Sequence, residues 1–80
     1  MKTVTWGQPL EVDFVYAGVR AIGGPAEALN CLNHLWPDRR GPRYVAARSV
    51  CRAAIDGRKS VEQAREVFRT ALEEAHLKLH

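Results

Sequence analysis

The stretch SVEQAREVFRTALEEA, residues 60–75, carries the clearest helix signal in this chain of 80 residues. It opens as a capping box, in which the Ser60 hydroxyl accepts from the Gln63 backbone N–H and the Gln63 side chain returns to Ser60. Apolar residues then recur every three or four positions, the period of an amphipathic helix. The apolar stripe consists of Val61, Ala64, Val67, Phe68, Ala71, Leu72 and Ala75. The opposite face mixes acids and bases, and Arg69 and Glu73 are spaced to pair.

Two further helices are predicted upstream, between prolines and glycines. The first runs from about Pro25 to Trp36, because a proline suits the first helical position and Pro37 stops the helix. The second runs from about Pro42 to Ile55 and ends against Gly57, a typical C′ residue. Their apolar faces collect Ala28, Leu29, Cys31, Leu32, Leu35 and Trp36 in the first helix, and Tyr44, Ala47, Val50, Cys51, Ala54 and Ile55 in the second.

The N-terminal part is predicted to form a β-hairpin. From Leu10 to Ile22 the pattern has the period of two that marks a half-buried strand, and Tyr16-Ala17-Gly18 supplies a turn. Because a two-stranded hairpin is marginal alone, we expect helices to cover one face. Trp6 and Val4 are expected to extend or cap the sheet. The predicted fold class is therefore α+β, a single domain over residues 1–80 with an N-terminal β-hairpin packed against three α-helices (ββααα).

Composition places the chain among ordinary globular proteins. It is 46% hydrophobic and 26% charged, and a domain of this length buries only about 60 to 65% of its unfolded surface, which leaves modest stability. The apolar runs fall far short of the roughly 20 residues that span a bilayer. The first nine residues lack the apolar centre of a secretory signal. We therefore expect a cytoplasmic protein without a membrane segment.

Charge is concentrated in the middle of the chain. From residue 39 to residue 59 the sequence holds seven basic side chains and one acidic one, a net charge of +6, while the other 59 residues hold five basic and eight acidic side chains, a net of −3. The basic residues are Arg39, Arg40, Arg43, Arg48, Arg52, Arg58 and Lys59. Arg48 and Arg52 fall on the face of the second helix opposite its apolar side, while Arg39, Arg40 and Arg43 crowd its start, where the helix dipole disfavours cations.

The order of several motifs resembles the family called domain of unknown function 982, small proteins mainly of soil-dwelling alphaproteobacteria. The resemblance spans essentially the whole chain and rests on Trp6, Pro9-Leu10, Ala28-Leu29, Leu35-Trp36-Pro37, Arg40-Gly41-Pro42, Ala46-Ala47, Cys51, Ala54-Ile55-Asp56-Gly57, Ala64-Arg65, Phe68, Ala71 and Glu74-Ala75. At residues 76–80 the chain departs from the glycine-containing finish expected for the family. The resemblance implies one compact α+β domain and no particular activity.

Motifs for catalysis, cofactors or metals are weak. Cys31 and Cys51 fall on apolar helix faces, where a thiol is usually a small core residue, and a disulfide between them is the less favoured alternative. Cys31 and His34 are near neighbours on the helix wheel, but a buried thiol is a poor nucleophile. The cysteine and histidine spacings fit no zinc motif. We predict no catalytic, cofactor-binding or metal-binding residues.

Two other patterns receive plain structural interpretations. Gly23-Gly24-Pro25 precedes a helix, as phosphate-binding turns do, but its glycine spacing fits neither common nucleotide fingerprint, and it is interpreted as a corner between strand and helix. Glu11 and Asp13 share the polar side of a strand and are interpreted as solvated acids.

The basic residues carry the functional hypothesis. Guanidinium groups bind carboxylates and phosphates bidentately, so Arg39, Arg40, Arg43, Arg48 and Arg52 form the candidate partner-binding set. The first interpretation is a small non-enzymatic interaction module that binds an acidic protein partner or a second copy of itself, through these residues or the hairpin edge. The alternatives are a nucleic-acid-binding accessory protein, for which no motif is present, and a small-ligand binder or enzyme whose site forms only in an oligomer. Solvation, or pairing of Arg39 or Arg40 with Asp38, Glu73 or Glu74, explains the same residues without function.

Overall fold

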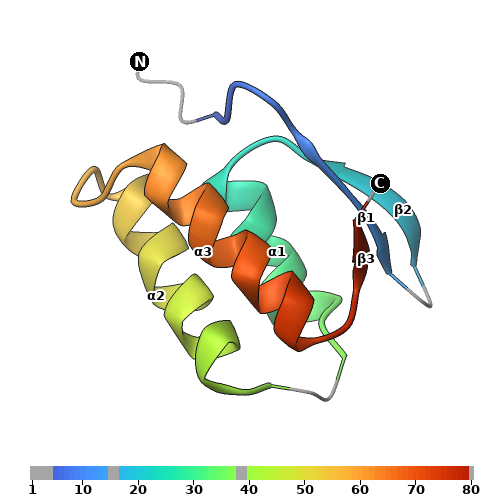
Figure 1. Cartoon of the computed structure of the whole chain (residues 1–80). Coiled ribbons are helices and arrows are strands. Elements are labelled where there is room, and N and C mark those ends of the chain that lie inside the picture. The colour runs from blue at the N-terminus through green and yellow to red at the C-terminus, as the bar shows by residue number, and fades with distance from the viewer. Residues whose placement is uncertain (1–4, 15–16, 38–39, 80) are drawn as a thin grey trace.

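A computed structural model describes residues 5–14, 17–37 and 40–79. Its elements in chain order are β1 (Leu10–Phe14), β2 (Gly18–Ile22), α1 (Pro25–His34), α2 (Pro42–Ile55), α3 (Val61–Glu74) and β3 (Lys78–Leu79). The strands form an antiparallel sheet in the order β2-β1-β3, and the helices lie on one side of it, with α2 farthest from the strands (Figure 1). The α+β prediction of a hairpin followed by three helices is confirmed.

The hairpin forms in the register that its alternation predicts. Leu10 pairs with Ile22 and Phe14 with Gly18. Leu10, Val12 and Phe14 are buried toward the helices, and Glu11 is exposed on the opposite face. Gly18 begins β2 with φ of 76°, a backbone conformation that glycine adopts without steric cost.

The sheet gains its third strand from the C-terminus. Lys78 pairs with Asp13 and Leu79 with Val12, on the edge of β1 that the hairpin leaves open. The predicted order ββααα therefore lacked its last element, since a strand of two residues cannot show an alternating pattern. Trp6 caps the core without forming a strand, and its backbone N–H donates to the carbonyl oxygen of Gly23 at 2.7 Å. Val4 lies outside the described residues.

The ends and faces of α1 and α2 differ from prediction in two places. The first helix ends at His34 and not at Trp36. A proline disfavours helical backbone angles in the residue before it, and Pro37 has this effect on Trp36. The Trp36 side chain is nevertheless buried. Ile55, predicted to lie on the apolar face of α2, is 39% exposed in the last turn.

The capping prediction for α3 is confirmed in its main bond. The Gln63 N–H donates to the Ser60 Oγ at 3.0 Å. The predicted pair between Arg69 and Glu73 is wrong, because the Arg69 guanidinium donates to both carboxylate oxygens of Glu66. An acid that precedes its base by one turn pairs more favourably with the helix dipole than the reverse order does.

Both α2 and α3 end in a Schellman motif, with a residue of left-handed backbone just after the helix. After α2 this residue is Gly57, as predicted, with φ of 81°, and the Arg58 N–H donates to the Ala53 carbonyl at 2.8 Å. After α3 it is His76, with φ of 57°, and the Leu77 N–H donates to the Leu72 carbonyl at 3.0 Å. The turn directs the chain from α3 into β3. His76 thus occupies a left-handed backbone position, which favours glycine.

We predict that His76→Gly raises the free energy of unfolding by about 0.5 to 1 kcal/mol, because glycine removes a left-handed strain that exceeds its entropic cost. Urea unfolding of the variant and the parent measures the difference. Gly57→His is the matched control and should destabilise by a similar amount, since a Cβ at Gly57 meets no atom within 4 Å and only backbone strain acts. A His76→Gly variant no more stable than the parent would contradict this account of the turn.

Candidate functional site

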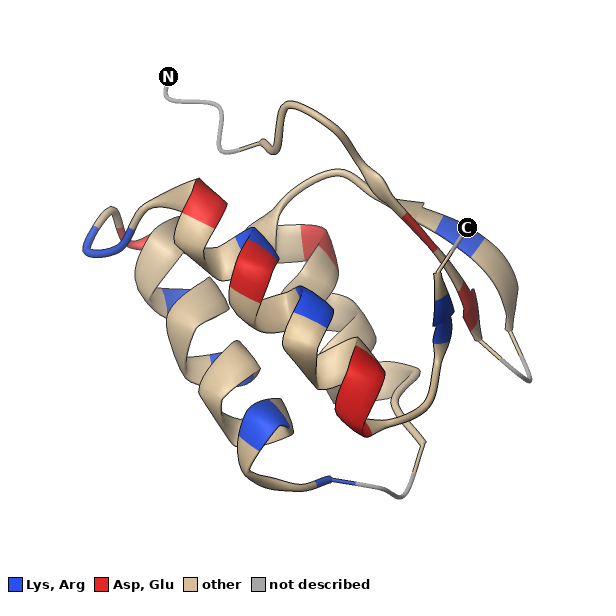
Figure 2. Ribbon diagram, in the orientation of Figure 1, with Lys and Arg blue, Asp and Glu red and all other residues tan. Residues whose placement is uncertain are grey.

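The charged residues of α2 are all basic. Arg43, Arg48 and Arg52 are exposed along this helix, and Arg40 is exposed just before it. Figure 2 shows only blue segments among the charged positions of α2, whereas α3 carries both colours. Arg39 lies outside the described residues. The predicted basic residues of the second helix are therefore exposed, and we call Arg40, Arg48 and Arg52 the α2 basic surface. Arg43 is nine residues before Arg52 and so lies on the opposite side of the helix.

The aromatic ring of Tyr44 contacts the guanidinium groups of two of these arginines. The guanidinium carbon of Arg40 lies 5.3 Å from the centroid of the Tyr44 ring, and that of Arg48 lies 5.9 Å from it. Both distances are within the range of a cation–π contact. The ring is itself fixed, because Tyr44 is buried and its hydroxyl donates to the Leu32 carbonyl oxygen at 3.0 Å. Two exposed guanidinium groups thus contact a buried ring whose hydroxyl is hydrogen-bonded.

The start of α2 is capped by a residue of α3. Glu74 accepts from the backbone N–H of Arg43 through Oε2 and from that of Tyr44 through Oε1, each at 3.2 Å. The Glu74 carboxylate also interacts favourably with the positive end of the helix dipole. This interaction offsets the unfavourable effect of the basic residues near the same end. Gly41 gives the carboxylate room, since a Cβ there would lie 2.7 to 2.9 Å from three Glu74 side-chain atoms. The N–H groups at the start of α2 are therefore bound to the protein's own carboxylate.

The α2 basic surface has no internal neutralisation among the described residues. The ion pairs between these residues are Arg58 with Asp56, at 3.2 Å, and Arg69 with Glu66. The predicted pairing of Arg40 with Glu73 or Glu74 does not form, because Glu74 binds backbone N–H groups instead. Asp38 lies outside the described residues. Within the described part of the chain, the guanidinium groups of the α2 basic surface therefore form no ion pair.

Both cysteines are free thiols, so the disulfide alternative is wrong. Cys51 is fully buried in α2, and this burial raises its pKa to about 12. Burial also raises the pKa of Cys31, although the nearby Arg20 guanidinium acts in the opposite direction. His34 is exposed on the solvent side of α1. Because the thiolate is the reactive form, neither cysteine is prepared for nucleophilic chemistry.

The predicted corner at Gly23-Gly24-Pro25 is held by the chain itself. The Gly23 N–H donates to Glu27 Oε2 at 3.2 Å, and the Gly23 carbonyl accepts from Trp6. Glu11 and Asp13 lie on the sheet face away from the helices, with Asp13 opposite Lys78. No described helix is both long and apolar enough to cross a membrane.

One feature near this corner was not foreseen from the sequence. A cavity of about 340 Å³ lies between β2 and α1, with Arg20 and Glu27 among its lining residues. The available signal was the position of Arg20, which the register places opposite the buried Val12 on the inner face of the sheet. A charged residue in such a place indicates that β2 extends beyond the helical layer.

The fold and its surfaces define a small α+β module with a basic helix. Residues 8–79 match the family described as "Protein of unknown function (DUF982)", and the chain belongs to this family, as its sequence motifs indicated. The NMR structure of Agrobacterium tumefaciens protein Atu1219 is similar, with 30% sequence identity, a TM-score of 0.79, and coverage of 95% of this chain and 83% of that one. No curated protein matches the sequence. Since these comparisons indicate no specific activity, the functional argument depends on the surfaces.

We predict that Glu74→Ala lowers the free energy of unfolding by about 1 to 2 kcal/mol, because two N–H groups at the start of α2 lose a charged acceptor. Glu74→Gln should cost less, since its amide oxygen can still accept one of the two bonds. Chemical denaturation measures both variants, with Glu73→Ala as the exposed neighbouring control. Equal stability of Glu74→Ala and Glu73→Ala would show that the cap contributes nothing.

We predict that native protein at pH 8 reacts slowly with the thiol reagent DTNB and that unfolding in guanidinium chloride releases both thiols. The reason is that Cys51 is fully buried and has a pKa of about 12, so its thiolate is almost absent at this pH. The colour change per chain, followed in Cys31→Ser and Cys51→Ser variants, assigns each reaction. Rapid native labelling of Cys51 would contradict the observed packing of α2.

Proposed function

We propose that this protein is a small non-enzymatic interaction module that binds an acidic surface of a partner protein through the α2 basic surface. The observation that carries the proposal is the stack of Arg40 and Arg48 on the immobile ring of Tyr44, without an ion pair to any described carboxylate. Arg52, one turn beyond Arg48, extends the same charge along the helix.

The stack lowers the entropic cost of binding. A free arginine loses rotamer freedom when it is immobilised, and side chains ordered at an interface cost about 0.5 to 1.5 kcal/mol each. Contact with Tyr44 restricts Arg40 and Arg48 before any partner arrives. A planar guanidinium in a restricted position offers paired N–H donors that match the two oxygens of a carboxylate. The arrangement therefore suits bidentate recognition of aspartate and glutamate side chains.

An acidic protein is favoured over a nucleic acid by the state of the aromatic residues. Proteins that bind single-stranded nucleic acids stack the bases on exposed aromatic rings. Here the described aromatic residues are all buried in the core: Trp6, Phe14, Trp36, Tyr44 and Phe68. Tyr44 is in addition already occupied by two guanidinium groups. A nucleic acid would find only backbone electrostatics on this surface.

The remaining parts of the proposal concern activity and compartment. The non-enzymatic assignment is supported by the two thiols, which are buried and have raised pKa values and are therefore weak nucleophiles. We propose the cytoplasm as the compartment, because two unpaired thiols fit reducing surroundings.

The test uses reversal of charge at two positions. We predict that Arg48→Glu/Arg52→Glu weakens binding to an oligoglutamate peptide by about tenfold or more, because two charge-assisted contacts become repulsions. Arg58→Glu/Lys59→Glu changes the charge equally at the exposed turn after α2 and is the matched control, expected to weaken binding only about twofold. Fluorescence anisotropy at low and moderate salt measures affinity, and thermal unfolding confirms that both variants fold.

The possible outcomes distinguish binding at the α2 basic surface from attraction by the net charge of the whole protein. Equal losses in the two double variants would overturn the proposal, because the protein would then act only through its net charge. Arg48→Lys/Arg52→Lys tests the guanidinium itself and should bind less tightly than the parent while keeping the charge. Tighter binding to duplex DNA, with a steep fall as salt rises, would favour the nucleic-acid alternative. Sedimentation that depends on Arg48 and Arg52 without any added ligand would make the partner a second copy of the chain.

A further inference from the structure

The cavity between β2 and α1 arises because the helical layer does not cover the outer strand. Of the five residues of β2 only Ile22 is buried, whereas alternate residues of β1 are sealed against the helices. Figure 1 shows β2 at one side of the molecule and α2 at the other, so this cavity is remote from the α2 basic surface. The inference that follows is independent of the function proposed for that surface.

The lining of the cavity combines an apolar floor with polar groups of both charges. Its residues include Ile22, Leu35, Cys31, Asn30, Arg20 and Glu27. Ile22 and Cys31 are buried and Leu35 is half-buried, while Arg20, Glu27 and Asn30 are exposed. Most small-molecule sites have this composition, an apolar surface with a few polar groups that fix orientation, and the volume of about 340 Å³ is near the lower end of their range. The cavity has room for a small molecule.

Arg20 and Glu27 face the cavity without neutralising each other. Both residues line the cavity together with Cys31. Nevertheless the two ion pairs between described residues, Arg58 with Asp56 and Arg69 with Glu66, do not include them. The Arg20 guanidinium and the Glu27 carboxylate therefore border one cavity but form no ion pair with each other. A ligand that carries one negative and one positive group can pair with both.

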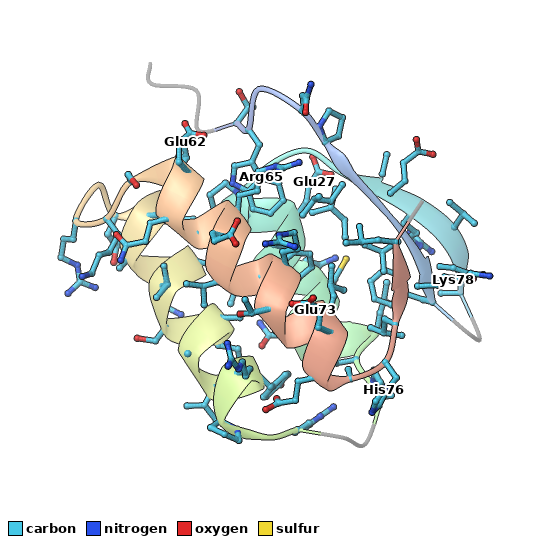
Figure 3. All side chains as sticks on the ribbon, in the orientation of Figure 1. Glu27, Glu62, Arg65, Glu73, His76 and Lys78 are labelled. Atoms are coloured by element: carbon cyan, nitrogen blue, oxygen red, sulfur yellow. The ribbon has the colours of Figure 1, made fainter. Side chains whose placement is uncertain are left out.

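The positions of the two charges are set by the backbone. Arg20 is directed inward by its register opposite Val12. Glu27 lies in the first turn of α1, labelled in Figure 3, and the Gly23 N–H donates to its Oε2 at 3.2 Å. This hydrogen bond restrains the carboxylate and leaves its second oxygen available as an acceptor. The cation comes from the strand and the anion from the helix, on the two walls of the cavity.

From this geometry we propose that the cavity binds a free α-amino acid with an apolar side chain. The ligand carboxylate pairs with the Arg20 guanidinium, and the ligand ammonium group pairs with the Glu27 carboxylate. Asn30 supplies a further polar contact from α1. The apolar side chain of the ligand covers Ile22, Cys31 and Leu35. A molecule with only one of the two charges leaves the other protein charge without a partner and binds less tightly.

The test titrates ¹⁵N-labelled protein with three ligands that share one apolar group. L-leucine carries both charges, 4-methylpentanoate lacks the ammonium group, and 3-methylbutylamine lacks the carboxylate. Each is added to roughly 20 mM, well above the millimolar Kd expected of an open site. We expect leucine to cause saturable amide shifts at residues 20–22 and 27–31 and to bind about fivefold or more tightly than either analogue.

Variants assign the two charges. Arg20→Gln and Glu27→Gln should each weaken leucine binding about fivefold or more, and Glu27→Gln retains an oxygen that can accept from the Gly23 N–H. Arg58→Gln and Glu62→Gln remove the same charges away from the cavity and should bind leucine as the parent does. The amide spectra show at the same time whether each variant is folded.

The overturning results are equally specific. The proposal fails if leucine leaves the amides of residues 20–22 and 27–31 unshifted in folded protein. It also fails if 4-methylpentanoate binds as tightly as leucine and Glu27→Gln has no effect, because the site would then recognise a carboxylate alone.

Discussion

The structure depends on one cluster of aromatic rings that joins every layer of the chain. Phe68 of α3 is fully buried. The centroid of its ring lies 5.8 Å from the ring centroid of Trp6 and 5.7 Å from that of Trp36. Trp36 in turn lies 6.3 Å from Phe14 and 6.0 Å from Tyr44. The N-terminal segment, β1, the loop after α1, α2 and α3 each contribute one ring. In a domain with little interior, such large side chains supply much of the available apolar burial.

This cluster also determines where the functional candidates lie. The Tyr44 ring packs in a tilted arrangement against Trp36 and also contacts Arg40 and Arg48, so the position of these guanidinium groups follows from the core. The third helix acts in a similar way, since Phe68 anchors its middle while Glu74 caps the neighbouring helix. A surface arranged by buried residues is rigid, and rigidity is what allows a few exposed charges to recognise a partner at low entropic cost.

The sequence predicted those parts of the fold that depend on local chemistry. The Ser60 cap, the Gly57 helix end and the Leu10–Phe14 alternation each have a cause within a few residues, and the structure confirms them. The sequence did not predict contacts between distant segments. Glu74 caps a helix that begins about thirty residues earlier, and β3 pairs with a strand from the other end of the chain. The spacing of apolar residues along the sequence gives no information about such long-range contacts.

The same distinction applies to the candidate site. The exposure of Arg48 and Arg52 could be derived from helical geometry, and the structure agrees. The stack on Tyr44 could not be derived, because Tyr44 was assigned only to the apolar face and Arg40 precedes the helix. The cavity between β2 and α1 was missed for a related reason. The cavity is lined by residues of β2 and α1. The distance between these elements depends on how far the helices extend under the sheet, and the spacing of residues in the sequence does not determine that extent.

The α2 basic surface brings two like charges to one aromatic ring. Arg40 and Arg48 lie 5.3 and 5.9 Å from the centre of one ring, so their guanidinium carbons are no more than about 11 Å apart. The screening length at physiological salt is about 8 Å, so the two like charges repel appreciably only where their separation is shorter than this. A neutral side chain at either position would remove one charge and its cation–π contact, and would leave the aromatic core intact. Like charges gathered where the aromatic core does not require them are a local conflict of the kind found at functional sites, and this supports the partner-binding role proposed for α2.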